Sequence, residues 1–250
     1  MNIFIATHKP FSAPKEKCYT ALHVGAQGKD SIGFLGDNTG DNISLKNSNY
    51  CELTGMYWIW KNCKESVVGL VHYRRYFFDH PFSDHIMNED EIKKVLKKSD
   101  VIIAQRGYTW FNSVENNYRQ KHTESDIELT RKAINDLYPR YSSSFEKVMK
   151  SNHYSQFNMM ICRKEIFDSY CAWLFDVLGY VEKNLIVPLE DRTKYEKRVF
   201  GFLSERLLIV WLMSNSQYKV IEKPVFNTEE SMVSQRLISV VKKVIGLFWK

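Results

Sequence analysis

The sequence lacks several patterns that identify common enzyme classes. It has no GxGxxG or GxxxxGK[ST] glycine cradle for nucleotide phosphates and no HExxH pair, and its five cysteines show no CxxC or other metal-ligand spacing. No local signature of a serine triad or of a cysteine–histidine nucleophile occurs either. The odd number of cysteines, together with a first segment that shows no signal-peptide pattern, favours a reducing cytoplasm.

Acidic residues are absent from the last twenty positions. The chain has a formal net charge of +6, of which +4 lies in residues 231–250, so residues 1–230 carry only +2. Because a nucleic-acid-binding fold usually spreads positive charge over its surface, we expect no nucleic-acid partner.

The same basic segment is amphipathic. Its apolar face would hold Val233, Leu237, Val240, Val241, Val244 and Phe248, and its polar face Gln235, Ser239, Lys242, Lys243 and Lys250, with Trp249 near the end. A basic amphipathic helix with terminal aromatics is typical of a membrane interface, and this one is too interrupted by charge to span a bilayer. The alternative is a helix that simply packs on the domain.

Apolar segments alternate with helical ones along the rest of the chain. Buried strands are predicted over 3–6, 67–71, 100–104, 157–162 and 218–222. Helices are predicted over 50–62, where Asn49 and Glu52 have capping-box spacing, and over 88–98, 165–182 and 195–213, with a polar helical stretch over 114–150 broken at Pro139. The glycine-rich segment 25–49 is predicted to be a long loop. We therefore expect a single α/β domain over 1–230 with a mostly parallel sheet, followed by the amphipathic tail 231–250.

Polar side chains follow three of the predicted strands, in Thr7-His8-Lys9, His72-Tyr73-Arg74-Arg75 and Gln105-Arg106. Ligands of open α/β sheets bind beyond the carboxyl ends of the strands, so these segments are predicted to converge on one crevice. Arginine forks bind phosphates bidentately and stay charged, which indicates a phosphate or diphosphate ligand for Arg74 and Arg75. The alternative is that both arginines pair with surface carboxylates.

A second group of candidates lies in YEKRVFGFLSER. On one helical face, Gly201 would leave a recess between Arg198 and Glu205 that a ligand could enter. Glu205 stands where the helix becomes wholly apolar, so a raised pKa and a general-base role are predicted, the alternative being an ion pair with Arg198 or Arg206. His122 is a further candidate, on a predicted helical face with Tyr118 and Asp126.

Six segments carry a resemblance to a known family. They are ATHKPF, DNTGDNISLKN, ELTGMYWIWKN, VGLVHYRRYF, NMMICRKEIFDSYCAWLF and RVFGFLSERLLIVW, in this order over residues 3–225. The sequence resembles a bacterial domain family encoded with capsular polysaccharide, exopolysaccharide and O-antigen genes, whose members are regarded as glycosyltransferases, some of them galactofuranosyltransferases. The resemblance implies an A-type, Rossmann-like glycosyltransferase fold.

The resemblance also implies the substrates and the setting. A nucleotide-sugar donor, with UDP-linked sugars such as UDP-galactofuranose as the expected class, would give its sugar to a lipid-linked saccharide. The protein would be cytoplasmic and peripheral on the inner face of the cytoplasmic membrane. Two alternatives stay open: a non-catalytic scaffold of the polysaccharide assembly machinery, and an enzyme that processes phosphate esters.

Within this reading, our hypothesis assigns roles to the candidate residues. Donor binding would involve Thr7, His8, Lys9, Asp41, Asn42, His72 and Arg198, with Arg74 and Arg75 on the diphosphate; Glu205 would be the catalytic base; and Asn158, Gly201 and His122 would face the acceptor. The Asp-x-Asp metal motif usual in this superfamily is absent, so Arg74 and Arg75 would neutralise the leaving group in place of a metal. A need for Mg²⁺ or Mn²⁺ is left open.

Overall fold

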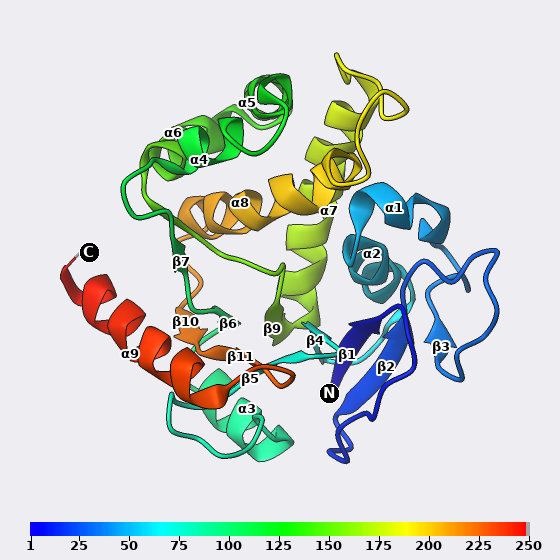
Figure 1. Cartoon of the computed structure of the whole chain (residues 1–250), viewed down its shortest axis with the longest axis vertical. Helices are drawn as coiled ribbons and strands as arrows, with labels where there is room; N and C mark the ends of the chain where they lie inside the picture. Colours follow the sequence, from blue (N-terminus) through cyan, green and yellow to red (C-terminus); the bar gives the residue numbers. More distant parts are fainter. Residues whose placement is uncertain (249–250) are drawn as a thin grey trace.

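The structure, a computed structural model, describes residues 1–248, and its described side chains end at Ile245 (Figure 1). Trp249, Lys250 and the Phe248 side chain, all predicted for the amphipathic tail, lie outside the described part. The helices are α1 Asn47–Tyr50, α2 Leu53–Asn62, α3 Glu89–Leu96, α4 Val114–Arg119, α5 Glu124–Leu137, α6 Ser142–Lys150, α7 Lys164–Lys183, α8 Val199–Ser214 and α9 Met232–Phe248, with 3₁₀ turns at Ser44–Lys46, Pro139–Tyr141 and Glu196–Arg198.

The central sheet has the strand order β10-β6-β9-β4-β1-β2-β3, and β5 and β11 extend it beside β4. Its strands are β1 Asn2–Thr7, β2 Tyr19–His23, β3 Leu35–Gly36, β4 Val67–His72, β5 Arg75–Phe77, β6 Val101–Ala104, β9 Met160–Arg163, β10 Val220–Lys223 and β11 Val225–Asn227; β7 Gly107–Tyr108 and β8 His153–Tyr154 form a separate pair. Along the main path the neighbours are parallel except at β9, which is antiparallel to β4 and β6. The predicted α/β class with a mostly parallel sheet is confirmed.

Strand β4 shows why the sheet is packed so closely at its centre. Val68, Leu70 and Val71 are fully buried, as expected for a strand covered on both faces. At Gly69 a Cβ atom would lie 2.7 Å from Ile161 Cγ1 and 2.8 Å from the Met160 carbonyl oxygen, so only glycine allows β9 to approach.

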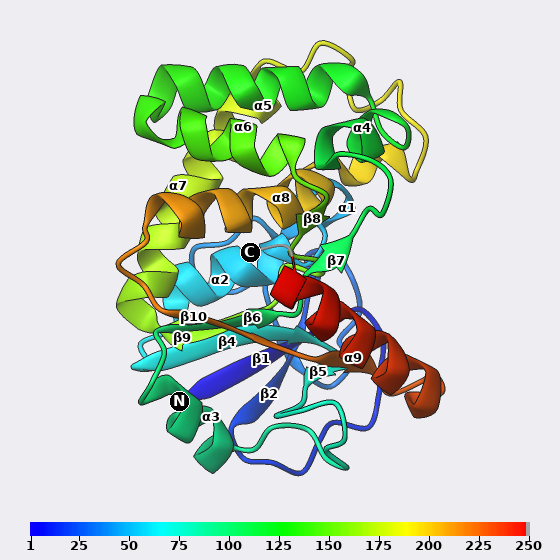
Figure 2. The ribbon, with the colours of Figure 1, turned by 90° about the vertical axis from the view of Figure 1, so that its left-hand side faces the viewer.

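Helices cover both faces of the sheet. Helices α2, α7 and α8 share one hydrophobic core with the sheet, while α3 and the β5/β11 extension pack on the opposite face. Figure 2 shows that α4, α5 and α6 form a further layer beyond α8. Among the described residues, no helix combines the length and the apolar character needed to cross a bilayer.

Most predicted elements are found. The strand predicted over 157–162 begins only at Met160, because Phe157 and Asn158 have left-handed backbones, and one helix prediction is wrong. The helix predicted over 50–62 is two helices, because Cys51 has a left-handed backbone (φ 54°) between α1 and α2. The predicted capping box does not form: the Asn49 side-chain amide donates to the Lys197 carbonyl (2.9 Å), and Glu52 accepts from Asn158. The predicted helix over 88–98 is α3, with a capping box between Asn88 and Glu91.

Candidate functional site

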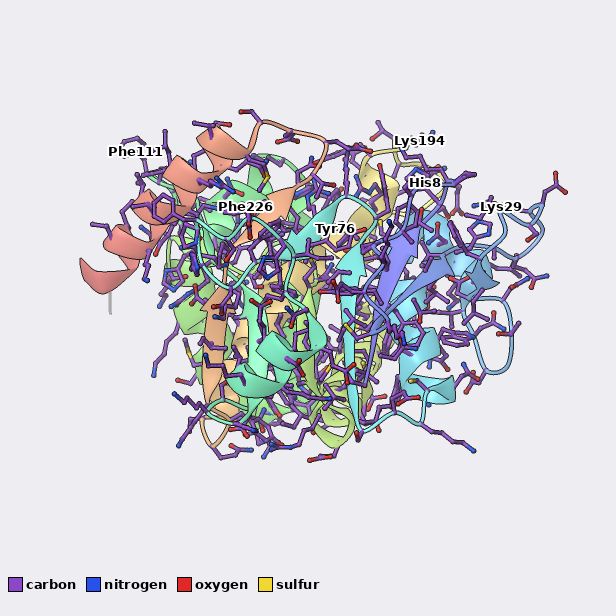
Figure 3. The ribbon with its side chains drawn as sticks, turned by 90° about the horizontal axis from the view of Figure 1, so that it is seen from below. His8, Lys29, Tyr76, Phe111, Lys194 and Phe226 are labelled. Atoms are coloured by element: carbon purple, nitrogen blue, oxygen red, sulfur yellow. The ribbon has the colours of Figure 1, made fainter. Side chains whose placement is uncertain are left out.

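A cavity of about 710 Å³ lies at the carboxyl ends of β1 and β4. Thr7 and His8 line it at the end of β1, and the segment from His72 to Arg75 lines it where β4 leads into β5. Lys194 comes from the loop after α7, and Figure 3 shows it close to His8 at one edge of the molecule. The junction of α1 and α2 and the beginning of α8 complete the wall with Asn47, Ser48, Cys51, Glu52, Lys197, Arg198 and Glu205, together with Ala6, Val24 and Phe157.

The two adjacent arginines both line this cavity, but only one has a carboxylate partner. Arg74 lies 3.4 Å from Glu229, and its side chain is 37% exposed. The Arg75 guanidinium lies 4.6 Å from the centre of the Phe157 ring, and no carboxylate of the described residues lies within ion-pairing distance of it. Burial and the neighbouring Arg74 both lower the pKa of Arg75. Surface ion pairing, the alternative for both arginines, therefore holds only for Arg74.

Further cations enter the cavity from a loop that sequence reasoning missed. Lys194 and Lys197 line it next to Arg198, and neither lysine has an ion-pair partner within the part of the chain that the structure describes. The loop is fixed by Arg192, which forms a buried bidentate ion pair with Asp126 on α5 (2.6 and 2.7 Å). Because the anchor joins residues 66 positions apart, local sequence gave no signal for it.

Glu205 lies in the cavity wall as predicted. One of its carboxylate oxygens accepts the backbone N–H of Phe157 (2.8 Å), and the other lies 3.4 Å from Arg206. Burial raises the pKa of Glu205, only partly opposed by Arg206 and the Phe157 N–H. Arg198 forms no ion pair with Glu205; its Nε donates to the Cys51 sulfur (3.3 Å).

A second carboxylate, Glu52, also lines the cavity and was not predicted. It accepts a hydrogen bond from the Asn158 side-chain amide (2.7 Å), which also donates to the Gly201 carbonyl (3.2 Å). Asn158 is buried and so lies behind the wall rather than in it. Glu52 was not predicted here because its spacing from Asn49 indicated a helix cap. The sequence gives no sign of the left-handed backbone at Cys51, which separates the two helices.

Phe157 and Asn158 connect the polar groups of the wall. Both have left-handed backbones (φ 74° and 52°), an uncommon conformation for residues other than glycine. The Phe157 N–H binds Glu205, and its carbonyl accepts from His72 Nε2 (2.7 Å). Burial lowers the pKa of His72, so its imidazole is a neutral donor at this contact. This strained turn holds Glu205, Glu52 and His72 in fixed positions around one cavity.

Three predicted donor residues lie outside the lining. Asp41 accepts from the Tyr57 hydroxyl (3.1 Å) and so holds the long loop against α2. Asn42 accepts from the backbone N–H of Ser44 (3.1 Å) within the loop itself. Lys9 lies over the Tyr73 ring and 3.7 Å from Glu229, beside the cavity lining.

Two residues that were predicted to bind the acceptor, Gly201 and His122, also lie outside the cavity lining. A Cβ atom at Gly201 would lie 3.1 Å from the Cys51 sulfur, so Cys51 fills the predicted recess. His122 stacks on Phe202 with ring centres 4.2 Å apart, and burial lowers its pKa to about 4. The helical face predicted for it does not exist, because α4 ends at Arg119 and α5 begins at Glu124.

The third strand end does not join the cavity. Arg106, after β6, pairs with Glu222 and contacts the His153 ring. Within residues 1–248, no group of three or more His, Cys, Asp or Glu side chains is arranged to hold a metal ion.

Comparison with known proteins gives two matches. Residues 2–216 match the model of a family described as a domain of unknown function, DUF4422. The apo structure of a bifunctional glycosyltransferase, WbbM, is similar with a TM-score of 0.85 and 28% identity, covering 92% of this chain and 45% of that one. This chain thus spans about half the length of its structural relative, and the expected glycosyltransferase-type fold is confirmed. No protein with a curated description matches.

Proposed function

The chain belongs to the DUF4422 family, and on this premise we propose that it is a glycosyltransferase that uses a nucleotide-sugar donor, with UDP as the expected nucleotide. The observation that carries the proposal is the cavity charge: five cations, Arg74, Arg75, Lys194, Lys197 and Arg198, face two carboxylates at the carboxyl ends of two parallel strands. A diphosphate would supply the negative charge that this wall lacks. The similarity to a bifunctional glycosyltransferase supports the same reaction class.

In the proposed donor complex, Arg75 and Arg74 bind the diphosphate. Arg75 is the stronger candidate because it has no carboxylate partner to give up among the described residues. Thr7, His8 and His72 lie around the same space and are assigned to the donor, and Arg198 with Lys194 would close the charge around it. We assign no donor role to Lys9, Asp41 or Asn42 and no acceptor role to Gly201 or His122, because none of them lines the cavity.

The proposed reaction is an inverting displacement. Glu205 removes the proton of an acceptor hydroxyl, whose oxygen attacks the anomeric carbon of the donor sugar. The bond from that carbon to the diphosphate oxygen breaks, and the nucleoside diphosphate leaves with the electron pair and is stabilised by the arginines. The raised pKa of Glu205 suits a base of this kind. Glu52 and Asn158 would keep the wall in position on the acceptor side.

The proposed acceptor is a lipid-linked saccharide of capsule, exopolysaccharide or O-antigen synthesis, met at the inner face of the cytoplasmic membrane. Helix α9, which follows the matched family segment, would hold the enzyme there. Support for this part comes from the basic and amphipathic sequence of the helix.

One incubation tests the reaction class. Purified protein is mixed with a panel of nucleotide sugars, including UDP-galactofuranose, and a synthetic lipid-diphosphate acceptor, with and without EDTA. We expect sugar transfer from one UDP-sugar, and the EDTA arm reports any metal requirement. Transfer from no donor, together with no nucleotide binding, would contradict the proposal and favour a scaffold.

A further inference from the structure

Helix α9 packs on the domain through its polar side. The Ser239 hydroxyl donates to Gln105 Oε1 (2.7 Å), and the Gln105 amide donates back to the Ser239 carbonyl (3.0 Å). Gln235 is bound in the same way at the backbone of Asn227, which donates to its Oε1 (2.6 Å) and accepts from its Nε2 (2.9 Å). These paired contacts fix the rotation of the helix about its axis.

That rotation turns the apolar side of α9 away from the protein. Its exposed residues lie on one face at spacings of three and four, and they are Val233, Leu237, Ile238, Val241 and Val244, between 47% and 68% exposed. A helix that packs on a soluble domain normally buries this face. The helix therefore presents a continuous apolar stripe outward, with Lys243 exposed beside it.

A second apolar element projects on the same side of the molecule. Phe111, in the loop between β7 and α4, is fully exposed, and its neighbour Trp110 is 59% exposed and has a left-handed backbone (φ 58°). Figure 3 shows Phe111 beside α9, and Figure 2 shows the loop after β7 and α9 on the side that faces the viewer. Large exposed apolar residues on two neighbouring elements indicate an interaction surface rather than a single exposed side chain.

The position of this surface relative to the cavity indicates what it binds. In Figure 3, α9, Phe111, His8 and Lys194 lie along one edge of the molecule, so the apolar stripe and the cavity wall share that edge. The segment 231–250 has four basic residues and no acidic one. Lys243 is exposed beside the stripe, while Arg236 donates to the Ser83 carbonyl (2.9 Å) and Lys242 is half-buried. An apolar stripe with an exposed lysine beside it and no acidic residue in its segment matches an anionic bilayer, with its acyl boundary and negative headgroups.

We propose that α9 and the Trp110–Phe111 loop together form a docking surface for an anionic membrane, with α9 lying flat in the interface and the cavity beside the headgroups. This rests on the proposed function in one respect, because a lipid-linked acceptor would then enter the cavity from the membrane. The docking itself needs no catalysis and can be measured without it.

The test uses the full chain and vesicles of phosphatidylcholine, with and without phosphatidylglycerol, in a co-sedimentation assay. Wild-type protein is expected to bind the anionic vesicles. Leu237→Gln combined with Val241→Gln is expected to lower the partition coefficient by at least about tenfold, since two apolar side chains no longer enter the interface. Phe111→Ser is expected to lower it by several-fold. Lys243→Gln is expected to lower binding to anionic vesicles by roughly fivefold and to leave phosphatidylcholine binding unchanged.

The matched control is Leu45→Gln, which changes a leucine that is 79% exposed in the 3₁₀ turn Ser44–Lys46, directly before α1. Figure 1 shows α1 on the opposite side of the molecule from α9. It is expected to bind vesicles like wild type. Equal vesicle binding by wild type and the Leu237/Val241 variant would overturn the proposal. So would a wild-type dimer in the absence of vesicles that this variant converts to a monomer, because the stripe would then be covered by a second copy.

Transfer to a water-soluble acceptor separates the two proposals. The Leu237/Val241 variant is expected to retain wild-type activity on such an acceptor while it loses vesicle binding. Vesicle binding without any transfer would contradict the proposed function alone, and transfer without vesicle binding would contradict the docking surface alone.

Discussion

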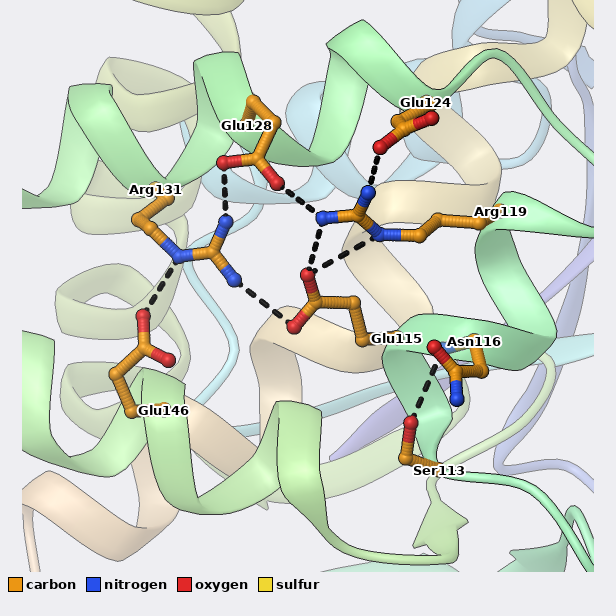
Figure 4. Close-up of polar contacts among 8 residues, drawn as sticks. All are labelled: Ser113, Glu115, Asn116, Arg119, Glu124, Glu128, Arg131 and Glu146. Atoms are coloured by element: carbon orange, nitrogen blue, oxygen red, sulfur yellow. Dashed lines mark hydrogen bonds and ion pairs between the residues drawn. The ribbon is translucent and has the colours of Figure 1, made fainter.

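Two arginine pairs in this protein have opposite surroundings. On the α4–α6 layer, Arg119 contacts Glu115, Glu124 and Glu128, and Arg131 contacts Glu115, Glu128 and Glu146, in one closed network (Figure 4). At the end of β4, Arg74 has one carboxylate partner, Glu229, at 3.4 Å, and the Arg75 guanidinium lies over the Phe157 ring.

The comparison distinguishes two kinds of arginine. Arg119 and Arg131 stabilise the fold through ion pairs, whereas Arg74 and Arg75 are proposed to bind a ligand. In the α4–α6 layer, four carboxylates surround two guanidiniums, so the charges are satisfied within the protein. At the cavity, loss of hydration and repulsion from Arg74 act on Arg75, and attraction from Glu230 and Glu52 only partly opposes them. Such an arrangement costs stability unless an external anion binds, so the two pairs should respond to mutation in opposite ways.

The largest expected effect is on the cavity pair. Arg74→Ala combined with Arg75→Ala should lower donor turnover by roughly a thousandfold or more, since loss of one oxyanion-type contact typically costs on the order of a hundredfold. Its melting temperature should be unchanged or higher, because two like charges are removed. Steady-state kinetics and thermal unfolding check both parts, and turnover within about threefold of wild type would refute the electrostatic role.

Glu205→Gln is expected to have the next largest effect. Loss of the general base should lower kcat by on the order of a hundredfold or more, while the Gln carbonyl can still accept the Phe157 N–H. Binding of UDP should stay close to that of wild type. A variant with wild-type kcat would show that another group removes the proton, and Glu52 would be the first to test.

The pH dependence of the wild type follows from the same residue. Burial raises the pKa of Glu205, and a base must be deprotonated, so kcat/KM should fall as pH decreases through this raised pKa. The effect of Glu205 on stability runs in the opposite direction to its effect on activity. Because the folded state favours the protonated Glu205 carboxyl, the ionised carboxylate lowers the free energy of unfolding once the pH rises past that pKa. Glu205→Gln should therefore not lower the melting temperature at neutral pH. An acidic limb that is unchanged in the residual activity of the variant would contradict the assignment.

Mutation of the ion-paired arginines on the α4–α6 layer should lower stability and leave donor turnover unchanged. Arg131→Met leaves Glu115, Glu128 and Glu146 without one of their cations, at a cost of about 1–2 kcal/mol for a site that is partly exposed. For a chain of this size that corresponds to a drop of roughly 2–8 °C in melting temperature. Donor turnover per folded molecule should not change. If Arg131→Met lost donor turnover while its melting temperature stayed at the wild-type value, the two arginine pairs would not differ in role, and the comparison would be wrong.

The smallest expected effect is at Lys194. Lys194→Gln should weaken UDP binding by roughly fivefold at low salt, because one unpaired charge near the surface contributes about 1 kcal/mol, and the difference should shrink as salt screens it. Titrations at two salt concentrations measure this. A difference that does not depend on salt would indicate that Lys194 acts by packing.

Local sequence patterns were sufficient for most of the longer elements and for the residues at the ends of β1 and β4. The apolar run of β4 followed by HYRRYF placed Arg74 and Arg75 correctly, because the carboxyl end of a buried parallel strand has a fixed relation to the ligand side of the sheet. The position of Glu205 in the cavity wall was predicted for a similar reason, since it precedes the wholly apolar part of α8, and its role as a base stays a prediction.

Residues placed by backbone exceptions or distant anchors could not be predicted in the same way. The left-handed Cys51 breaks a regular helical pattern, turns Glu52 into the cavity and fills the space expected beside Gly201. Lys194 depends on the Arg192–Asp126 ion pair, which local spacing does not encode. The tail was predicted as amphipathic, but which side faces the domain is decided by polar contacts such as Ser239 with Gln105.

Calorimetric titration of UDP into three proteins tests the central claim most directly: wild type, Arg75→Ala and Arg131→Met. If the Arg75 guanidinium binds the diphosphate, UDP should bind wild type at one site and should bind Arg75→Ala at least about tenfold more weakly. Arg131→Met should bind UDP with wild-type affinity. Absence of UDP binding to wild type, or equal affinity for wild type and Arg75→Ala, would contradict it.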